Sequence, residues 1–337
     1  MATIRVAAVQ AEPVWLDVDA TAEKTIRLIE EAAGKGAQLV AFPETWIPGY
    51  PVFLWTLPAP AQIGFVGRYH ANSLTADHPA FKRIREAARD NRIIVVLGHS
   101  EKAHGTLYMA QTVVGADGSI LLHRRKLKPT HVERTLFGES DGSGIKVVDT
   151  PLGRIGALNC WEHLQPLTKY AMYAQNEQIH IASWPCFGVM NDIPALSADT
   201  NVGAVSLTYA LEGSSFVIVS SQIMSDEGAR TFALPDGSLP PIYNGGGGYA
   251  RVYGPDSSLL TAALPPDQEG IVCADIDLAD IDLAKNAADP AGHYARPDVT
   301  RLLFDPAPKR PVAGPGSYGT EVAFPDLEEV REGVEAL

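Results

Sequence analysis

Three short segments each place a reactive or charged side chain directly after an apolar run that is typical of a buried strand. The first segment carries Glu44, the second a run of basic residues from His123 to Lys128, and the third Cys160. In α/β folds, the loops that follow strand ends carry catalytic groups. These residue types offer a carboxylate base, a cation and a thiol nucleophile.

The loop that carries Glu44 is unusually apolar. Pro43 cannot continue a strand ladder, so Glu44 is expected just past the edge of the sheet. Aromatic residues follow it closely, namely Trp46, Tyr50, Phe53 and Trp55. Among such groups a glutamate would be desolvated, which raises its pKa toward that of a useful base. A solvent-exposed loop glutamate is the alternative interpretation.

The basic run is expected to contain a buried lysine. Strand alternation places Arg124, Lys126 and Lys128 on one face. If that face is covered, at least one of the lysines needs a carboxylate partner, and Glu44 and Glu133 are the candidates. The alternative is an exposed basic strand or a basic targeting sequence.

Cys160 stands where an apolar strand ends at Asn159 and a helix begins a few residues later. A strand-to-helix turn can hold a thiol near backbone N–H groups, which favours the thiolate. Residues 161–163 (Trp-Glu-His) add hydrogen-bond partners at the turn. A small core hydrophobe remains the alternative, and it is the preferred interpretation for Cys186 and Cys273.

Apolar runs and helical patterns alternate along the chain, which predicts a mixed sheet with helices packed outside it. Predicted strands are 4–9, 37–42, 93–98, 106–114, 119–124, 145–149, 154–158, 179–183, 216–220, 249–253 and 271–275; predicted helices are 20–33, 79–89, 165–175, 198–212 and 278–287. Gly34 is expected to cap the first helix. Residues 224–247 are interpreted as a long surface loop, and residues 303–316 as an extended, proline-containing segment.

Composition narrows the function further. The chain has 337 residues, a formal net charge of −13 and three cysteines. The negative charge argues against a nucleic-acid partner and fits a neutral substrate better than a polyanion. Neither a disulfide framework nor a structural zinc site is implied. The chain shows neither a signal-peptide pattern nor an apolar run of roughly 18 residues, so we expect a cytoplasmic protein with no membrane partner.

Residues 36–51 and 156–169 resemble the two signature segments of the nitrilase branch of the carbon–nitrogen hydrolase superfamily, and residues 125–130 resemble its lysine motif. Lys126 follows Glu44 by 82 residues, and Cys160 follows Lys126 by 34, which also fits that family. The resemblance covers residues 4–305 and includes residues 169–174, 177–185 and 289–298. It implies an α/β fold, a four-layer α-β-β-α sandwich, with one domain over residues 1–305. Residues 306–337 lie outside the resemblance, and we expect them to form an extended C-terminal tail involved in oligomer contacts.

The same resemblance implies the roles of the reactive residues. Glu44 is the general base, Lys126 the charged stabiliser, Cys160 the nucleophile, and Glu133 the second glutamate that positions them. Lys126 is preferred over Lys128 because it directly precedes the Leu-x-Pro-Thr sequence. The predicted substrate-binding residues, drawn from the aromatic and histidine residues near these segments, are Tyr50, His131, Trp161 and Trp184. The same apolar pocket is expected to include Trp46, Phe53, Trp55 and Phe187.

The implied reaction is attack of the Cys160 thiolate on an organic nitrile, followed by two additions of water that release ammonia and a carboxylic acid. It needs no metal or organic cofactor. Family members assemble as homodimers that build larger spirals. The alternatives are cyanide hydratase or dihydratase activity and aliphatic amidase activity. A non-enzymatic filament scaffold is disfavoured, because it gives no reason to retain Glu44, Lys126 and Cys160 together.

Overall fold

The computed structural model describes residues 3–186, 193–234, 236–238 and 245–309. Its strands are β1 (Ile4–Ala11), β2 (Leu39–Ala41), β3 (Ile94–Ala103), β4 (Thr106–Val114), β5 (Ile120–Arg125), β6 (Val148–Thr150), β7 (Gly153–Asn159), β8 (Ile179–Trp184), β9 (Phe216–Gln222), β10 (Arg251–Tyr253) and β11 (Gly270–Ile276). The helices are α1 (Val18–Gly34), α2 (Phe53–Thr56), α3 (Ala59–Ala71), α4 (Pro79–Asp90), α5 (Pro166–Tyr173), α6 (Val205–Gly213), α7 (Asp226–Arg230) and α8 (Ala279–Ala287).

The strands form two half-sheets that face each other. One half runs β5-β4-β3-β2-β1 and the other β9-β8-β7-β6; β11 pairs with β1, and β10 with β9. The halves meet where β1 and β9 run parallel, through only two residue pairs, Gln10 with Ser221 and Ala11 with Gln222. The Gln111 side chain also spans the halves, because its Nε2 donates to the Leu158 carbonyl at 3.2 Å.

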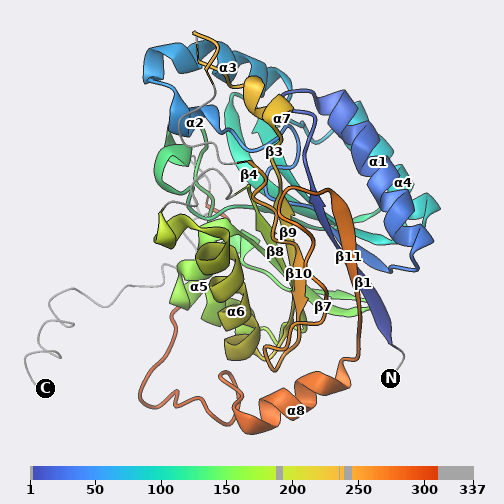
Figure 1. Ribbon diagram of the computed structural model, residues 1–337. Coiled ribbons are helices and arrows are strands. Elements are labelled where there is room, and N and C mark those ends of the chain that lie inside the picture. The colour runs from blue at the N-terminus through green and yellow to red at the C-terminus, as the bar shows by residue number, and fades with distance from the viewer. Residues whose placement is uncertain (1–2, 187–192, 235, 239–244, 310–337) are drawn as a thin grey trace, which may run out of the picture.

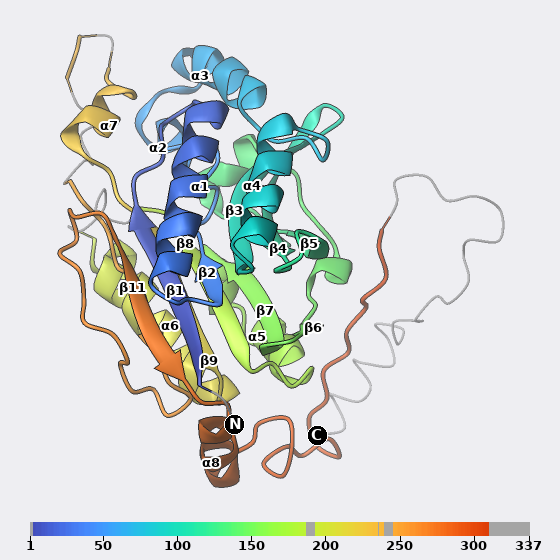
Figure 2. The same cartoon turned by 90° about the vertical axis from the view of Figure 1, so that its right-hand side faces the viewer.

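Three apolar clusters give this arrangement four layers (Figures 1 and 2). The central cluster takes one face of strands from both halves, including Val6, Val96 and Ile181, so it lies between the half-sheets. A second cluster joins the opposite face of β1–β3 to α1 and α4. A third joins β7–β9 to α5 and α6. The predicted α-β-β-α sandwich is confirmed.

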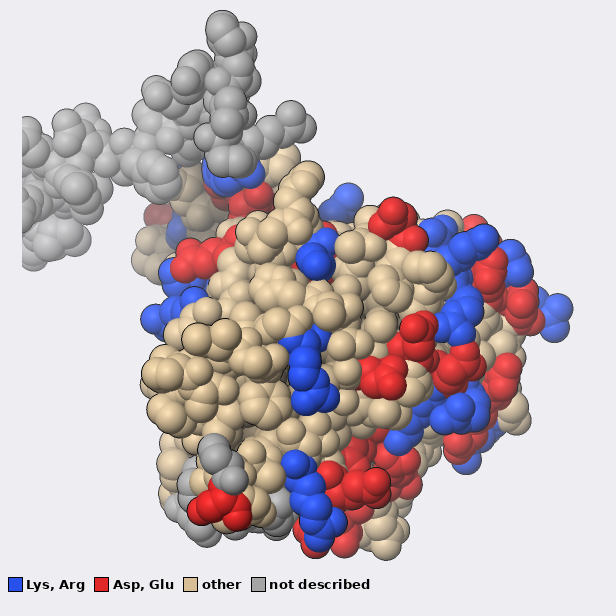
Figure 3. Space-filling view, turned by 90° about the horizontal axis from the view of Figure 1, so that it is seen from above, with Lys and Arg blue, Asp and Glu red and all other residues tan. Residues whose placement is uncertain are grey.

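The outer surface over α1 and α4 carries charges of both signs close together (Figure 3). Arg83 of α4 pairs with Asp19 and Glu23 of α1, while the apolar side of α4, with Phe81 and Ile84, packs inward. None of the described helices is long and apolar enough to cross a membrane.

The predicted elements differ from the structure in several places. Gly34 is the last residue of α1, and Lys35 caps that helix. The helix expected over 198–212 is divided into a π-helical turn, Asp199–Ala204, and α6. Helices α2 and α3 were not predicted, because α3 buries only Tyr69 and therefore lacks an apolar stripe.

The segment 224–247 is not simply a surface loop. It contains α7 and a fully buried Phe232, and Met224 pairs with Gly246. The expectation of a surface loop was therefore wrong for its described part, while residues 235 and 239–244 lie outside the described residues. The predicted tail is described only as far as Lys309.

Candidate active site

Glu44 lies just beyond β2, at the join of the half-sheets, and is fully buried. Its Oε1 accepts a hydrogen bond from Lys126 Nζ at 3.0 Å, whereas Oε2 has no hydrogen-bond partner among the described residues. Gln222, the last residue of β9, fixes the loop: its Nε2 donates to the Glu44 carbonyl at 2.6 Å, and its Oε1 accepts from the Tyr50 N–H at 3.2 Å. One carboxylate oxygen thus remains free to exchange a proton.

Lys126 is the cation of this cluster. It follows directly after β5, and its side chain is completely buried. Besides the bond to Glu44, Nζ donates to Glu133 Oε2 at 2.8 Å, so the expected pairing with a carboxylate is confirmed for both candidates. Lys128 is exposed and pairs with Glu139, because β5 ends at Arg125 and strand alternation does not continue to residue 128.

Glu133 is held in place by three donors. It lies in a 3₁₀ turn, His131–Thr135, that begins with a capping box at Thr130. The Thr130 N–H donates to Oε2 at 2.6 Å, alongside Lys126, and the Tyr50 hydroxyl donates to Oε1 at 2.9 Å. The carboxylate therefore holds the Lys126 ammonium group in a fixed direction relative to Glu44.

Cys160 begins the 3₁₀ turn Cys160–Leu164 that follows β7, and its φ of 46° lies in the left-handed region. Glu162 fixes this turn. Its Oε2 accepts from the Asn159 N–H at 2.8 Å, and its Oε1 accepts from Arg124 Nη2 at 2.6 Å and from the Leu127 N–H at 2.8 Å. Arg124 and Leu127 flank Lys126 along the chain, so Glu162 ties the cysteine turn to the lysine segment.

The electrostatics favour a protonated thiol in the resting site. Burial raises the pKa of Cys160 well above its usual range; the Glu44 carboxylate adds to this, and Lys126 opposes it. Burial also raises the pKa of Glu44, to about 8, although Lys126 opposes that shift. The pKa of Lys126 is raised, because Glu133 and Glu44 together outweigh its own burial. The Trp161 N–H does favour the thiolate, as the turn suggested, but burial outweighs it.

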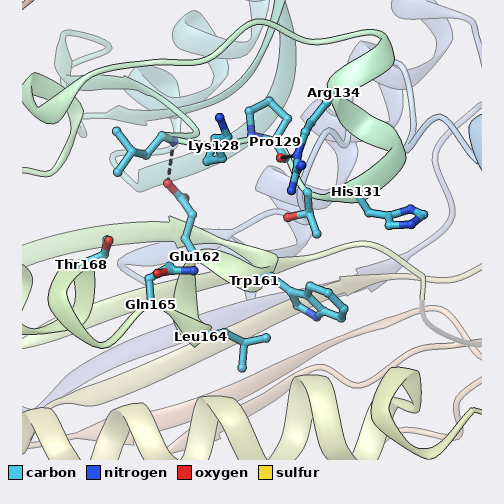
Figure 4. A pocket seen from close by; sticks show the side chains of 11 residues that line it. Lys128, Pro129, His131, Arg134, Trp161, Glu162, Leu164, Gln165 and Thr168 are labelled. Carbon is cyan, nitrogen blue, oxygen red and sulfur yellow. Dashed lines mark hydrogen bonds between the residues drawn. The ribbon is translucent and has the colours of Figure 1, made fainter.

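A pocket of about 470 Å³ opens between the segment that follows Lys126 and the segment that follows Cys160. Its walls come from residues 127–131 with Arg134 on one side, and from residues 161, 162, 164, 165 and 168 on the other (Figure 4). The predicted substrate-binding residues His131 and Trp161 both line it. His131 stacks on Trp55 with ring centroids 5.1 Å apart, and Trp161 Nε1 donates to Asn201 Oδ1 at 2.6 Å.

The other predicted pocket residues lie elsewhere. Trp184 is fully buried in the third apolar cluster and stacks on His163, with ring centroids 5.2 Å apart, and it does not line this pocket. Tyr50 is buried with its hydroxyl bonded to Glu133. Trp46 and Phe53 are core residues rather than wall residues. Phe187 lies outside the described residues.

The sequence predicted Glu133 and the hydrogen-bond partners at residues 161–163, but it missed other residues that hold the reactive groups. Gln222 gives no sequence signal of its own, because it lies 178 residues from Glu44. Glu162 and Arg124 each adjoin a recognised motif, but their buried pairing, 38 residues apart, depends on the tertiary fold. Among the described residues, no group of three or more His, Cys, Asp or Glu side chains is arranged to hold a metal ion.

Comparison with known proteins identifies the family of this chain. Residues 5–286 match the carbon–nitrogen hydrolase family model. A carbon–nitrogen hydrolase from Helicobacter pylori G27 has the same fold, with a TM-score of 0.70 and 21% identity over 88% of this chain and 96% of that one. The chain belongs to the carbon–nitrogen hydrolase family.

Within that family, the chain is similar to nitrilases over most of its length. It is 51% identical to an aliphatic nitrilase from Rhodococcus rhodochrous over 92% of this chain and 85% of that one. It is 50% identical to a nitrilase from Pseudomonas syringae pv. syringae (strain B728a) over 99% of this chain and 96% of that one. The resemblance to the nitrilase branch is confirmed, and the protein is a hydrolase of carbon–nitrogen bonds other than peptide bonds.

Proposed function

We propose that the protein is a nitrilase that converts an organic nitrile to a carboxylic acid and ammonia, with Cys160 as nucleophile, Glu44 as general base, and Lys126 as the cation that stabilises developing negative charge. The single observation that carries these roles is the buried Glu44–Lys126–Glu133 cluster, which is electrostatically coupled to a buried thiol. Relatives about half identical to this chain are named nitrilases, which supports the reaction class.

The proposed reaction begins with transfer of the thiol proton to Glu44, whose Oε2 has no other partner among the described residues. The sulfur forms a bond to the nitrile carbon, and the nitrile nitrogen takes a proton to give a thioimidate. Lys126 and the Trp161 N–H stabilise charge on that nitrogen. Water then adds to the carbon, ammonia leaves, and a thioester remains. A second water, activated by Glu44, cleaves the thioester and restores the thiol.

Glu133 and Tyr50 complete the proposed site without touching the reacting carbon. Glu133 holds the Lys126 ammonium group, and the Tyr50 hydroxyl holds Glu133. We place His131 and Trp161 at the substrate's organic group, because both line the pocket beside the cysteine turn. Aromatic and apolar wall groups fit a neutral aromatic or aliphatic nitrile.

We also propose a domain organisation, an oligomeric state and a cellular compartment for the protein. Residues 1–305 would form the catalytic domain, and residues 306–337 a tail used in oligomer contacts. Exposed apolar side chains on α5 and α6, Leu167 and Leu211, support a homodimer, which would build larger spirals. The three cysteines are free thiols, which supports a reducing cytoplasm.

The test is ammonia release from benzonitrile, phenylacetonitrile, an aliphatic nitrile, cyanide and benzamide, measured for the wild type, Cys160→Ala and Cys186→Ala. Cys186 is also a buried free thiol and serves as the matched control. We expect activity on organic nitriles that is lost only in Cys160→Ala. Activity on cyanide or benzamide alone would move the protein to the cyanide-hydrating or amidase reactions, and full activity in Cys160→Ala would refute the mechanism.

A further inference from the structure

A second buried polar network lies directly behind the cysteine turn and does not include Glu44, Lys126 or Glu133. His163 Nδ1 is 2.6 Å from the Cys160 carbonyl oxygen, and His163 Nε2 is 2.8 Å from His180 Nε2. His180 Nδ1 is 2.7 Å from Glu177 Oε1, and the Tyr209 hydroxyl donates to Glu177 Oε2 at 2.5 Å. All of these side chains are buried. The network therefore ends on the backbone of the nucleophile.

The hydrogen bonds of this network have one consistent arrangement of protons when its groups are neutral. A carbonyl oxygen only accepts, so His163 must donate from Nδ1, which makes its Nε2 an acceptor. His180 must then donate from Nε2, and its Nδ1 must accept. The donor to Nδ1 can only be a protonated Glu177. The three contacts that run from the Cys160 carbonyl through His163 and His180 to Glu177 thus hold three protons, one from each of the three side chains. If one of these protons is removed, two lone pairs face each other in one of the contacts.

The surroundings support the neutral arrangement. Burial raises the pKa of Glu177 to about 8, while the Tyr209 hydroxyl opposes this. Burial lowers the pKa of both histidines well below the usual range, and Arg124 adds to the effect at His180. Among the described residues, Glu162 also faces the network and raises the pKa of both histidines, and Lys169 of α5 lowers that of His163. Tyr173 of α5 meets the Tyr209 ring with centroids 4.9 Å apart.

The fold makes room for Glu177 at a glycine. Gly156 of β7 pairs in register with His180 of β8, and a Cβ added at Gly156 would stand 1.9 Å from Glu177 Oε1. The Tyr209 ring of α6 stacks on the His180 ring with centroids 3.7 Å apart. Glu177 is therefore confined between β7 and α6, where its carboxyl group can face little other than His180 and Tyr209.

The carbonyl at the end of this network belongs to the same peptide group as the Trp161 N–H. The two bonds of a trans peptide lie in one plane and point in opposite directions. Fixing the Cys160 carbonyl against His163 therefore fixes the direction of the Trp161 N–H, which favours the Cys160 thiolate. The turn needs such an anchor, because Cys160 has a left-handed φ of 46° that a non-glycine residue rarely adopts.

We propose that Glu177, His180 and His163 are positioning residues that set the orientation of the Cys160–Trp161 peptide, and that they do so only while Glu177 is protonated. This inference rests on the proposed role of Cys160 as nucleophile. Loss of the Glu177 proton breaks one of the three contacts, and the peptide loses its fixed direction. Activity then falls on the alkaline side through Glu177, independently of any change at Glu44.

The decisive variants are Glu177→Gln and Glu177→Leu. A glutamine reproduces protonated Glu177 at every pH, because its amide nitrogen can donate to His180 while its oxygen accepts from Tyr209. A leucine removes both contacts. For the wild type and both variants we would measure kcat and KM on a nitrile from pH 6 to 10, together with the rate at which iodoacetamide alkylates Cys160. Thermal unfolding at each pH confirms that the variants are folded.

We expect wild-type kcat to fall above about pH 8, and Glu177→Gln to keep neutral-pH activity while losing this alkaline decline. Glu177→Leu should lose kcat about 10- to 100-fold at every pH with little change in KM. A decline that persists in Glu177→Gln, or a wild type without one, would overturn the proposal. If the wild type releases no ammonia from any nitrile, the proposed function fails, while the pH profile of Cys160 alkylation still tests whether Glu177 controls the turn.

Discussion

Glu44 and Glu177 are both completely buried carboxyl groups, and burial raises the pKa of each to about 8. Their partners differ. Glu44 faces a lysine and, through it, a second carboxylate, with one oxygen unpartnered among the described residues. Glu177 faces a tyrosine and a histidine, and both of its oxygens are engaged.

The difference teaches that the size of a pKa shift does not identify a catalytic group. Burial alone produces the upward shift, and a structural carboxyl group shows it as readily as a reactive one. What distinguishes Glu44 is an oxygen without a hydrogen-bond partner among the described residues, a neighbouring cation, and an electrostatic influence on the Cys160 thiol. What distinguishes Glu177 is that its proton completes a network ending on a backbone carbonyl. The two sites should therefore respond differently to the same substitution.

The largest effect is expected from replacing Lys126, the cation that the Glu44 cluster has and the Glu177 network lacks. Lys126→Met leaves Glu44 and Glu133 buried without their shared partner, which should lower the free energy of unfolding by about 3–5 kcal/mol and abolish nitrile hydrolysis. Urea unfolding and ammonia release measure the two effects. Lys82→Met is the matched control, because Lys82 is exposed on α4 away from the pocket, and it should leave both nearly unchanged. Equal behaviour of the two variants would contradict the proposed role of Lys126.

The next prediction compares the same substitution at Glu44 and at Glu177. Glu44→Gln removes the base while keeping its size, and kcat should fall by about 10²–10⁴-fold. Glu177→Gln makes the same chemical change and should leave kcat at pH 7 within about threefold, because the amide preserves the contacts to His180 and Tyr209. Steady-state kinetics on a single nitrile suffices. Similar losses in both variants would mean that the two sites do not differ as described.

A smaller effect is expected from the hydroxyl that holds Glu133. Tyr50→Phe removes one of its donors, and kcat should fall by about tenfold, equivalent to about 1.4 kcal/mol. Tyr69→Phe is the control: its hydroxyl is also buried and donates to the Gly49 carbonyl at 2.9 Å, but it does not contact Glu133. The control should lose stability without a comparable loss of kcat. A tenfold loss in both variants would point to a general disturbance of this region.

The last comparison concerns how stability varies with pH. In the unfolded chain, Glu177 ionises near its ordinary pKa of 4.5, whereas the folded protein keeps the proton up to about pH 8. Its stabilising contribution is fully present below pH 4.5 and is lost as the pH rises toward 8, by at most about 1.4 kcal/mol per pH unit. Urea unfolding of Glu177→Gln should therefore show a gain over the wild type that is larger at pH 8 than at pH 5. Parallel curves would contradict this.

The sequence predicted the reactive residues because their signals are local. An apolar run that meets a strand-breaking residue places Glu44 beyond β2, and a strand-to-helix turn places Cys160 after β7. The layers followed from alternating apolar runs in the same way. Local signals also explain the error at Lys128, where alternation was extended past the end of β5.

The rest of the site depends on contacts that no local pattern contains. Trp184 looked like a wall residue because it ends a strand near the site, but its ring faces the helical layer. Glu177 and His180 lie in one segment of the family resemblance and His163 in another, but no local pattern indicates that they touch. They meet because β7 and β8 are parallel neighbours and because Gly156 leaves space between them. Side-chain direction and the packing of neighbouring strands decide such contacts.

Gln222 makes the position of the Glu44 loop depend on a distant part of the chain. The proposed base, cation and nucleophile all precede residue 161, but the loop with Glu44 is held by a side chain at the end of β9. The side chain that holds this loop therefore lies on a strand that is synthesised after all three proposed reactive groups and that joins the other half-sheet at β1. The complete arrangement of the site requires both half-sheets to be in place.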